Sequence, residues 1–256
     1  MVAHVVTLVN QKGGVGKTTT AVSLAAALGR HGQRVLLVDL DPQANATSAL
    51  GVATNQRAGT YEALLEETPI TTCIVDVAEE QLSVVPSSAA LSGAEVELVP
   101  VLARERRLEV ALRPVLDSYD WILVDCPPSL GLLTINALTA SNSVIIPVQC
   151  EYMALEGLSR LMETLELVRR SLNPNLAVLG VVLTMFDSRT RLAQQVVDEV
   201  RGHFATTFDA VIPRAVRLSE APSHGQSIFR YEPSGRGAAA YDALAIEMLA
   251  RGGVAA

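Results

Sequence analysis

Residues 10–21 read NQKGGVGKTTTA, a glycine-rich run between an apolar segment, VVTLVN (5–10), and a small-residue stretch, SLAAALGRHG (23–32). The chain has two lysines, Lys12 and Lys17, and both lie in this run, whereas its other 18 basic residues are arginines. Glycines let backbone N–H groups approach an anion closely, and a following helix N-terminus adds partial positive charge. An ammonium group is compact enough to sit among phosphate oxygens. The run therefore predicts a phosphate-binding loop between a buried strand and a helix.

The end of this loop, Gly16-Lys17-Thr18, predicts that Lys17 contacts the β- and γ-phosphates and that the Thr18 hydroxyl coordinates Mg²⁺. The usual loop pattern begins with glycine at position 11, where this chain has Gln11, and Lys12 opens the loop instead. This variant resembles the deviant Walker A motif of the ParA/MinD family of P-loop ATPases. The resemblance implies ATP and Mg²⁺ as cofactors and a catalytic Lys12 that crosses a dimer interface to the partner subunit's nucleotide. The nucleotide-binding residues expected here are Lys12, Gly13, Gly14, Val15, Gly16, Lys17, Thr18 and Thr19.

Length and composition favour one large α/β domain. The chain has 256 residues, of which 49% are hydrophobic, and it contains no Pro/Ser-rich linker and no clear repeat. We expect a single ATPase domain over residues 1–250 and a flexible tail over residues 251–256. Because the first strand follows the N-terminus almost at once, neither a signal peptide nor a leading DNA-reading module is expected. No apolar stretch approaches the 18 residues of a membrane span.

The cysteines and the charge distribution indicate the cellular compartment and the region of the chain that could bind nucleic acid. Cys73, Cys126 and Cys150 are far apart and form no C-x-x-C pair, which predicts reduced core thiols in a cytoplasmic protein. The net charge of −7 argues against indiscriminate binding of polyanions. The charge is uneven, because residues 39–166 carry 6 bases against 19 acids and residues 167–256 carry 10 against 8. A nucleic-acid surface is therefore expected in the last third of the chain.

Short apolar runs alternate with helical stretches along the whole chain. Continuous apolar runs are typical of parallel strands that are covered on both faces. The expected fold is an α/β single-domain P-loop NTPase with a doubly wound, mostly parallel twisted sheet flanked by helices. Its ligands should lie at the carboxyl ends of the strands. The expected strands fall within residues 5–10, 34–41, 82–87, 121–128, 143–149, 176–187 and 208–214.

Three aspartates follow expected strands. Asp125 ends the run WILVD, the Walker B arrangement, in which a strand delivers one carboxylate that holds Mg²⁺ through water. The stretch VDLDPQANATSALG (38–51) resembles the family's D-x-D-P-Q-G-N-A-T segment, with Ala44 in place of glycine. By this resemblance, Asp41 is catalytic because it positions or activates the attacking water, and Asp39 lies in the outer shell of the metal. The expected metal site is thus Thr18, Asp39 and Asp125.

The stretch VIPRAVRLSEAPSHGQSI (211–228) resembles the family's I-P-R-N-V-R-L-S-E-A-P-S segment. In that segment the proline and its neighbours bracket the adenine, so Pro213 and Arg214 are expected in the base pocket. Ala215 replaces the family's asparagine and removes one possible base contact. Met185, at the end of another expected strand, is expected to line the same pocket.

The resemblance extends over nearly the whole chain to the ParA/Soj family of DNA-segregation ATPases. It implies a cytoplasmic, nucleoid-associated ATPase with no membrane attachment. It also implies an ATP-dependent sandwich dimer that binds double-stranded DNA without sequence preference. A ParB-type centromere-binding partner is expected to stimulate hydrolysis and release the dimer, in the segregation of a chromosome or a plasmid.

Binding to any duplex sequence requires contacts to phosphates rather than to base edges. Arginines of the last third that a dimer can place on one face are therefore the DNA-binding candidates. An ion pair with Glu220 or Glu232 is the competing role for an arginine in this region. The candidates are Arg189, Arg191, Arg217, Arg230 and Arg236.

Four other functions share parts of this pattern. A related ATPase that positions another intracellular cargo, such as a carboxysome or a chemoreceptor array, fits the same residues and stays open. A MinD-like membrane-cycling ATPase needs a basic amphipathic C-terminal helix, whereas YDALAIEMLARGGVAA (241–256) carries one arginine and two acids. An electron carrier of the nitrogenase-reductase type needs two placed cysteines per subunit. An ATP-dependent metabolic ligase needs a second substrate pocket, which the sequence does not reveal.

Overall fold

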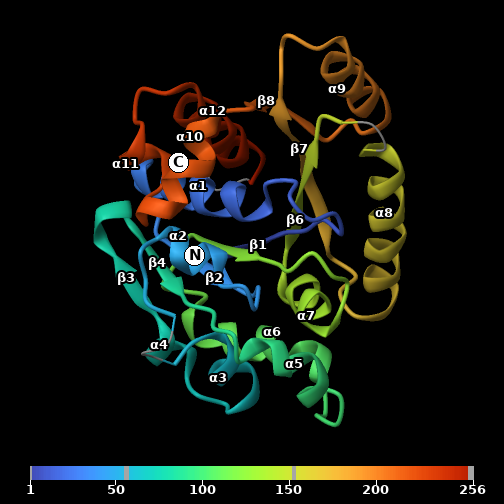
Figure 1. The fold of residues 1–256 in the computed structure, drawn as a ribbon. Coiled ribbons are helices and arrows are strands. Elements are labelled where there is room, and N and C mark those ends of the chain that lie inside the picture. The colour runs from blue at the N-terminus through green and yellow to red at the C-terminus, as the bar shows by residue number, and fades with distance from the viewer. Residues whose placement is uncertain (1, 55–57, 152–153, 253–256) are drawn as a thin grey trace.

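The computed structural model describes residues 2–54, 58–151 and 154–252, and in this part of the chain one eight-stranded sheet has helices on both faces (Figure 1). The strand order is β3-β4-β2-β5-β1-β6-β7-β8; β3 pairs antiparallel with β4, and the other neighbours are parallel. The predicted fold is thereby confirmed. The strands are β1 (His4–Leu8), β2 (Val35–Asp39), β3 (Val75–Val77), β4 (Leu82–Val85), β5 (Trp121–Asp125), β6 (Ser143–Gln149), β7 (Ala177–Phe186) and β8 (Thr207–Pro213).

All seven expected strands are present, and β3 is an addition that the sequence did not predict. Its three residues, VDV, are too few to form a recognisable apolar run, and it lies at the edge of the sheet. The α-helices are α1 (Lys17–Arg30), α2 (Asn45–Ala49), α3 (Thr60–Leu65), α4 (Ile70–Cys73), α5 (Leu91–Glu97), α6 (Arg107–Leu112), α7 (Leu132–Ala140), α8 (Ala154–Ser171), α9 (Arg191–His203), α10 (Val216–Glu220), α11 (Ile228–Tyr231) and α12 (Arg236–Arg251). Four 3₁₀ turns join them, η1 (Ala78–Glu80), η2 (Arg104–Arg106), η3 (Arg113–Val115) and η4 (Ala221–His224).

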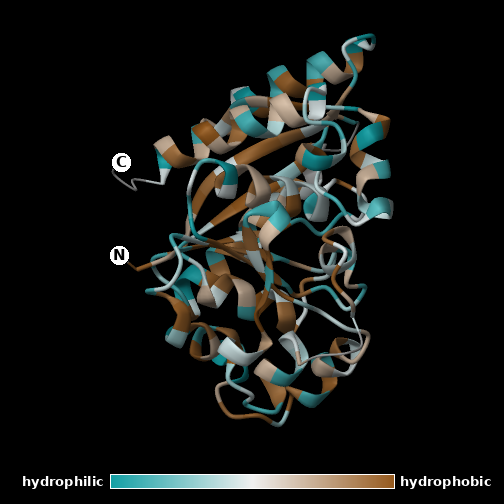
Figure 2. Cartoon of the chain, turned by 90° about the vertical axis from the view of Figure 1, so that its left-hand side faces the viewer, coloured by the Kyte–Doolittle hydropathy of each residue, from teal (hydrophilic) through white to brown (hydrophobic). Residues whose placement is uncertain are grey.

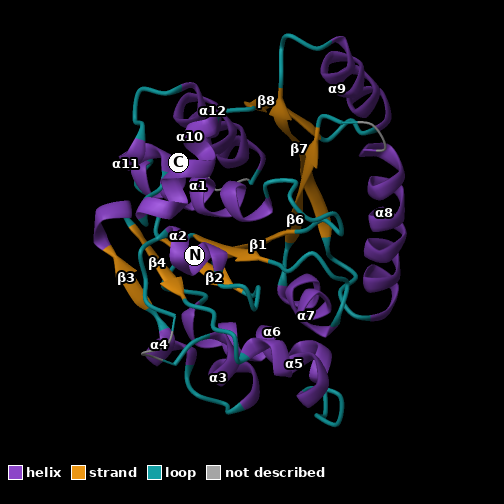
Figure 3. Ribbon diagram, in the orientation of Figure 1, coloured by secondary structure: helices purple, strands orange, loops and turns teal. Residues whose placement is uncertain are grey.

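Alternate residues of each central strand point to opposite faces of the sheet. On β5, Trp121 and Leu123 join the core beneath α1 and α12, whereas Ile122 and Val124 join the core beneath α3 to α7. A third core packs β6 and β7 against α8 and α9. Figure 2 shows the brown strands enclosed by helices whose outer faces are teal, and Figure 3 shows the orange strands between the purple helices. Burial of both faces explains why the strands are continuous apolar runs rather than alternating ones.

The last helix extends beyond the expected domain boundary. α12 ends at Arg251, whose guanidinium lies 3.9 Å from the centroid of the Phe208 ring and donates hydrogen bonds to the carbonyls of Leu179, Thr206 and Thr207. A tail that begins at residue 251 is therefore wrong for Arg251 and Gly252, because this arginine joins α12 to two strands. Residues 253–256 lie outside the described residues. In the part of the chain that the structure describes, no helix is both long enough and apolar enough to cross a membrane.

Candidate functional site

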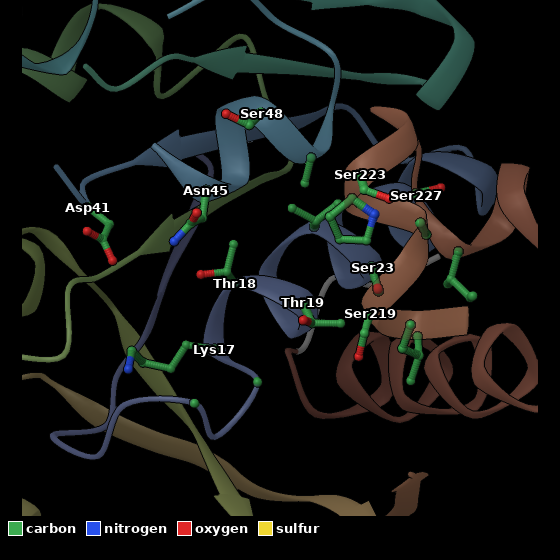
Figure 4. A pocket seen from close by; sticks show the side chains of 18 of the residues that line it. Lys17, Thr18, Thr19, Ser23, Asp41, Asn45, Ser48, Ser219, Ser223 and Ser227 are labelled. Carbon is green, nitrogen blue, oxygen red and sulfur yellow. The ribbon is translucent and has the colours of Figure 1, made fainter. Parts of the chain in front are cut away.

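The carboxyl ends of β1, β2 and β5 bring three loops together. Asp39, the last residue of β2, lies directly opposite Asp125, the last residue of β5, and Leu8 of β1 is the other register partner of Asp125. A cavity of about 700 Å³ opens at this edge of the sheet. In Figure 4, Lys17, Thr18 and Asp41 lie at one end of it and Ser219, Ser223 and Ser227 at the other. The glycine-rich loop and the serines of the stretch 211–228 thus lie at two ends of one cavity.

The glycine-rich loop borders the cavity through Gly13, Gly14, Gly16, Lys17, Thr18 and Thr19. Gly14 and Gly16 have φ of 74° and 85°, which side chains other than glycine rarely adopt. A Cβ added at Gly14 would meet no atom within 4 Å, so the loop backbone faces open space. Val15 is buried, and its carbonyl accepts a hydrogen bond from Thr184 Oγ1 of β7 at 2.8 Å. The loop is therefore held from behind and open in front, as an anion-binding loop requires.

The two lysines of the loop lie in different environments. Lys17 is 7% exposed, its Nζ donates to the carbonyl of Lys12 at 3.3 Å, and burial lowers its pKa. The side chain of Lys12 is 55% exposed, with its Nζ 3.8 Å from Glu151 Oε2. An exposed ion pair of this length is weak, so Lys12 can reorient outward at little cost.

Asp125 is a fully buried carboxylate with little compensation from protein groups. Among the described residues, no group makes a hydrogen bond of good geometry to either of its side-chain oxygens. Burial, with a further contribution from the charge of Asp39, raises its pKa well above the usual range for aspartate, although the nearby Thr18 hydroxyl acts to lower it. Such a carboxylate is expensive to bury unless a cation or a proton compensates it.

These residues fit Mg²⁺. The described residues contain no group of three or more His, Cys, Asp or Glu side chains that could cage a metal by themselves. Mg²⁺ is usually held by one or two carboxylates together with water and substrate phosphates, rather than by an all-protein cage. Asp125, with Thr18 on the wall of the cavity, matches that requirement.

Asp39 is buried, but its oxygens are occupied. Its Oδ2 accepts hydrogen bonds from the backbone N–H of Thr47 at 2.8 Å and from Thr47 Oγ1 at 2.6 Å, and its Oδ1 accepts from the N–H of Asp41 at 3.2 Å. Burial raises its pKa to about 6, against the effect of these hydrogen bonds. In the structure Asp39 thus fixes the loop between β2 and α2, and its expected place in the outer shell of the metal stays a prediction.

Asp41 lies at the phosphate end of the cavity and is 7% exposed. Its Oδ1 accepts a hydrogen bond from the N–H of Gln43 at 2.9 Å, and its carbonyl accepts one from Ser87 Oγ at 2.7 Å. A carboxylate held in this way on a cavity wall can accept a hydrogen bond from a bound water.

Cys126, next to Asp125, is buried, and burial raises its pKa well above the usual value for a thiol, which is consistent with a packing role.

The base end of the cavity differs from the expectation. Met185 lines it and has φ of 54°, a strained conformation for a non-glycine residue. Pro213 and Arg214 are not among the lining residues, and Arg214 Nη2 lies 3.2 Å from Glu151 Oε1. The wall is formed further along the same stretch, because α10 and η4 turn back over α1. It consists of Leu218, Ser219, Ala221, Pro222, Ser223, Gln226, Ser227 and Ile228.

The DNA-binding candidates lie in two regions. Arg189 and Arg191 lie at the start of α9, and Arg189 Nη2 pairs with Asp187 at 2.7 Å. Three others lie on or beside α10 to α12. Arg217 pairs with Glu220 at 2.7 Å and with Glu232 at 3.6 Å, and Arg230 lies 3.9 Å from Glu80. Arg191 and Arg236 are exposed at the beginnings of their helices.

Comparisons with known proteins agree with this geometry. The AAA domain family matches residues 3–178. The chain is 54% identical over 250 residues to the sporulation initiation inhibitor protein Soj of Bacillus subtilis. The alignment covers 97% of this chain and 99% of that protein. The chain is 53% identical over 252 residues to the chromosome partitioning protein ParA of Myxococcus xanthus, which covers 98% and 89%. A solved structure of cobyrinic acid a,c-diamide synthase from Mycobacterium smegmatis, with bound ATP analog and magnesium, is similar with a TM-score of 0.82 and 36% identity, covering 96% of this chain and 93% of that chain.

Proposed function

This chain belongs to the AAA-domain family and, within it, to the ParA and Soj chromosome-partitioning ATPases, and we propose that it acts as an ATP-dependent DNA-binding dimer. It is an ATPase that uses ATP with Mg²⁺. ATP joins two subunits into a sandwich, the sandwich binds duplex DNA without sequence preference, and a ParB-type partner stimulates hydrolysis and releases it. Identity above 50% to proteins named for chromosome partition, against 36% to the synthase, favours partition over a metabolic ligase.

The fully buried carboxylate of Asp125, next to the Thr18 hydroxyl, is the observation that carries the nucleotide site. Asp125 and Thr18 would hold Mg²⁺, which supplies a positive charge against the terminal phosphates. Lys17 reaches over the loop, and its ammonium group binds the β- and γ-phosphates among the backbone N–H groups of residues 13–19. Asp41 orients the attacking water. Met185 and the wall formed by α10 and η4 hold the base. Contacts of Pro213 and Arg214 with the base stay a prediction from the resemblance.

The exposure of Lys12 supports a role across the dimer interface. Lys17 already occupies the space over its own loop, so the half-exposed Lys12 is the lysine that can turn outward to the phosphates of a second subunit. Each bound nucleotide then receives Lys17 from its own subunit and Lys12 from the other subunit. The pairing of subunits doubles the arginines that face DNA in register, so ATP controls DNA affinity through dimerisation.

The test compares Lys12→Ala with Lys17→Ala in two measurements. Lys17→Ala is expected to abolish binding of a fluorescent ATP analogue. Lys12→Ala is expected to bind that analogue within twofold of wild type but to sediment as a monomer with ATP and Mg²⁺. A normal ATP-dependent dimer in Lys12→Ala would remove the bridging role, and unchanged affinity in Lys17→Ala would remove the phosphate site.

The DNA surface is tested with Arg189→Ala and Arg217→Ala on random duplex at two salt concentrations. Each phosphate contact that is lost should lower the salt slope by roughly one, equally on all sequences. Arg34→Ala is the matched control for Arg217→Ala, because Arg34, before β2, is about as exposed as Arg217 and pairs with Asp120 at 2.6 Å. Unchanged affinity in both candidates would place the DNA surface elsewhere.

A further inference from the structure

The N-terminus of α7 is capped by a side chain from another helix. Gly131, the residue before α7, has no side chain with which to cap it, and the first turn contains no acidic residue. The backbone N–H of Leu132 donates instead to Glu95 Oε2 at 3.0 Å, and the N–H of Leu133 points to Glu95 Oε1 at 3.5 Å. Glu95 lies on α5, 36 residues before Gly131 in the sequence. A carboxylate at this position satisfies free N–H groups and complements the helix dipole.

The contact between Glu95 and Gly131 is so close that a side chain at position 131 would displace the Glu95 carboxylate. A Cβ added at Gly131 would lie 2.1 Å from Glu95 Oε1 and 2.4 Å from its Cδ. The three nearest heavy atoms to such a Cβ all belong to Glu95. The carboxylate therefore occupies the space in which the N-cap side chain of most helices would lie.

This cap controls the segment that joins Asp125 to α7. The segment begins at the end of β5, where the strand ladder fixes Asp125, and Pro128 within it lines the cavity. Its other end is fixed where α7 begins. α5 and α7 lie next to each other in Figure 1 and share one core through Leu91 and Leu133. A carboxylate on α5 thus holds one wall of the phosphate end in place without lining the cavity itself.

We propose that Glu95 is a positioning residue for ATP hydrolysis. Its carboxylate caps α7 and thereby fixes residues 126–131 beside the phosphates. The inference rests on the ATPase site of the proposed function and is independent of dimerisation and DNA binding. A shift of this segment moves the reacting groups more than it changes the loop that binds the phosphates, so the turnover number, rather than ATP affinity, should depend on Glu95.

A reciprocal rescue tests the proposal. Glu95→Ala is expected to lower kcat by about three- to tenfold, the factor that corresponds to the loss of one helix cap. Its affinity for a fluorescent ATP analogue should stay within twofold of wild type. Gly131→Ser alone should lower kcat less than Glu95→Ala does, because the serine displaces the flexible Glu95 carboxylate but brings its own hydroxyl to the end of the helix. The double variant should recover most of the activity, since the serine hydroxyl can cap α7 in the space that Glu95 leaves.

Glu97→Ala is the matched control on the same helix. Glu97 is exposed, and its Oε2 accepts a hydrogen bond from the Tyr61 hydroxyl at 2.8 Å, with no contact to α7 among the described hydrogen bonds. Its kcat should equal that of wild type. Glu95→Gln, which keeps one acceptor oxygen but loses the charge, should be intermediate and provides a milder variant if Glu95→Ala folds poorly.

Three outcomes would overturn the proposal. A kcat of Glu95→Ala within twofold of wild type would mean that the cap has no effect on hydrolysis. A double variant no more active than Glu95→Ala would assign the carboxylate some other role. A loss of ATP affinity equal to the loss of kcat would indicate general damage to the site. Failure of the proposed function itself would appear differently, as absence of ATP hydrolysis in the wild type.

Discussion

The two loops that carry the candidate carboxylates are anchored in different ways. The loop between β2 and α2 is anchored from within, because Asp39 binds Thr47 and the N–H of Asp41 only a few residues away. The loop between β5 and α7 is anchored from outside by Glu95 of α5. The side-chain oxygens of Asp39 accept hydrogen bonds from its own loop, whereas those of Asp125 accept none of good geometry among the described residues. Asp39 therefore anchors its loop, and Asp125 is the carboxylate that is free to compensate a cation.

This difference predicts which property, stability or activity, a substitution in each loop should reduce. The first loop depends on a buried network in which every donor has its acceptor, and damage there should reduce the stability of the fold. The second depends on a half-buried contact between two helices, and damage there should reduce activity first. Substitutions within the first loop can test this contrast through the free energy of unfolding.

Thr47→Val should have the largest effect on stability. The valine keeps the shape of threonine but removes a hydroxyl that donates to Asp39 at 2.6 Å and accepts from the N–H of Ser87 at 2.9 Å. A buried hydrogen bond to a charged group is lost and a backbone N–H is left without its acceptor, so we expect a loss of about 3 kcal/mol. Urea denaturation of the metal-free protein measures it.

Thr47→Ser is the control for this prediction, since it keeps the hydroxyl and removes only a buried methyl group. It should cost about 1 kcal/mol. Equal losses for valine and serine would mean that packing, rather than the Asp39 network, stabilises the first loop.

The pH dependence of stability should identify Asp39 by its raised pKa. Its pKa is about 6 in the fold against 3.8 in the unfolded chain, so the folded state binds the additional proton between these values. The contribution of Asp39 to the free energy of unfolding is therefore fully present below pH 4 and is lost as the pH rises to 6. Asp39→Asn removes the titration, so the variant should gain about 2 to 3 kcal/mol relative to wild type between pH 4 and pH 7 without Mg²⁺. A constant difference between the two proteins over this range would contradict the raised pKa.

The contrast between contacts within a loop and contacts from a distant element also explains which features could be predicted from the sequence. The seven parallel strands and the carboxylates at their ends follow from local patterns, namely apolar runs and acids that directly succeed them. Glu95 was missed because its hydrogen-bond partner, Leu132, is 37 residues away and nothing in LSGAEVE distinguishes a capping carboxylate from a solvated one. The resemblance identifies the stretch 211–228 but not which of its side chains face the cavity, so base contacts of Pro213 and Arg214 stay a prediction, whereas Ser219, Ser223 and Ser227 line the cavity. Arg251 was assigned to a tail because the aromatic ring and carbonyls that hold it belong to distant strands.

Ala44→Gly should give the smallest effect in the first loop, a gain in stability that does not depend on pH. Ala44 has φ of 51° and ψ of 36°, a left-handed conformation that costs a non-glycine residue roughly 1 to 2 kcal/mol. Glycine removes this strain but adds entropy to the unfolded chain, so a net stabilisation of about 0.5 to 1 kcal/mol is expected. Ala103 provides a matched control with φ of 51° and ψ of 35°, before η2. In urea denaturation Ala103→Gly should be stabilised somewhat more than Ala44→Gly, because Ala44 is buried and its replacement also removes a buried methyl group, whereas Ala103 is exposed. Because Asp41 precedes Ala44 in the internally anchored loop, only Ala44→Gly should alter the ATPase rate; an equal change in Ala103→Gly would show that the rate responds to stability alone.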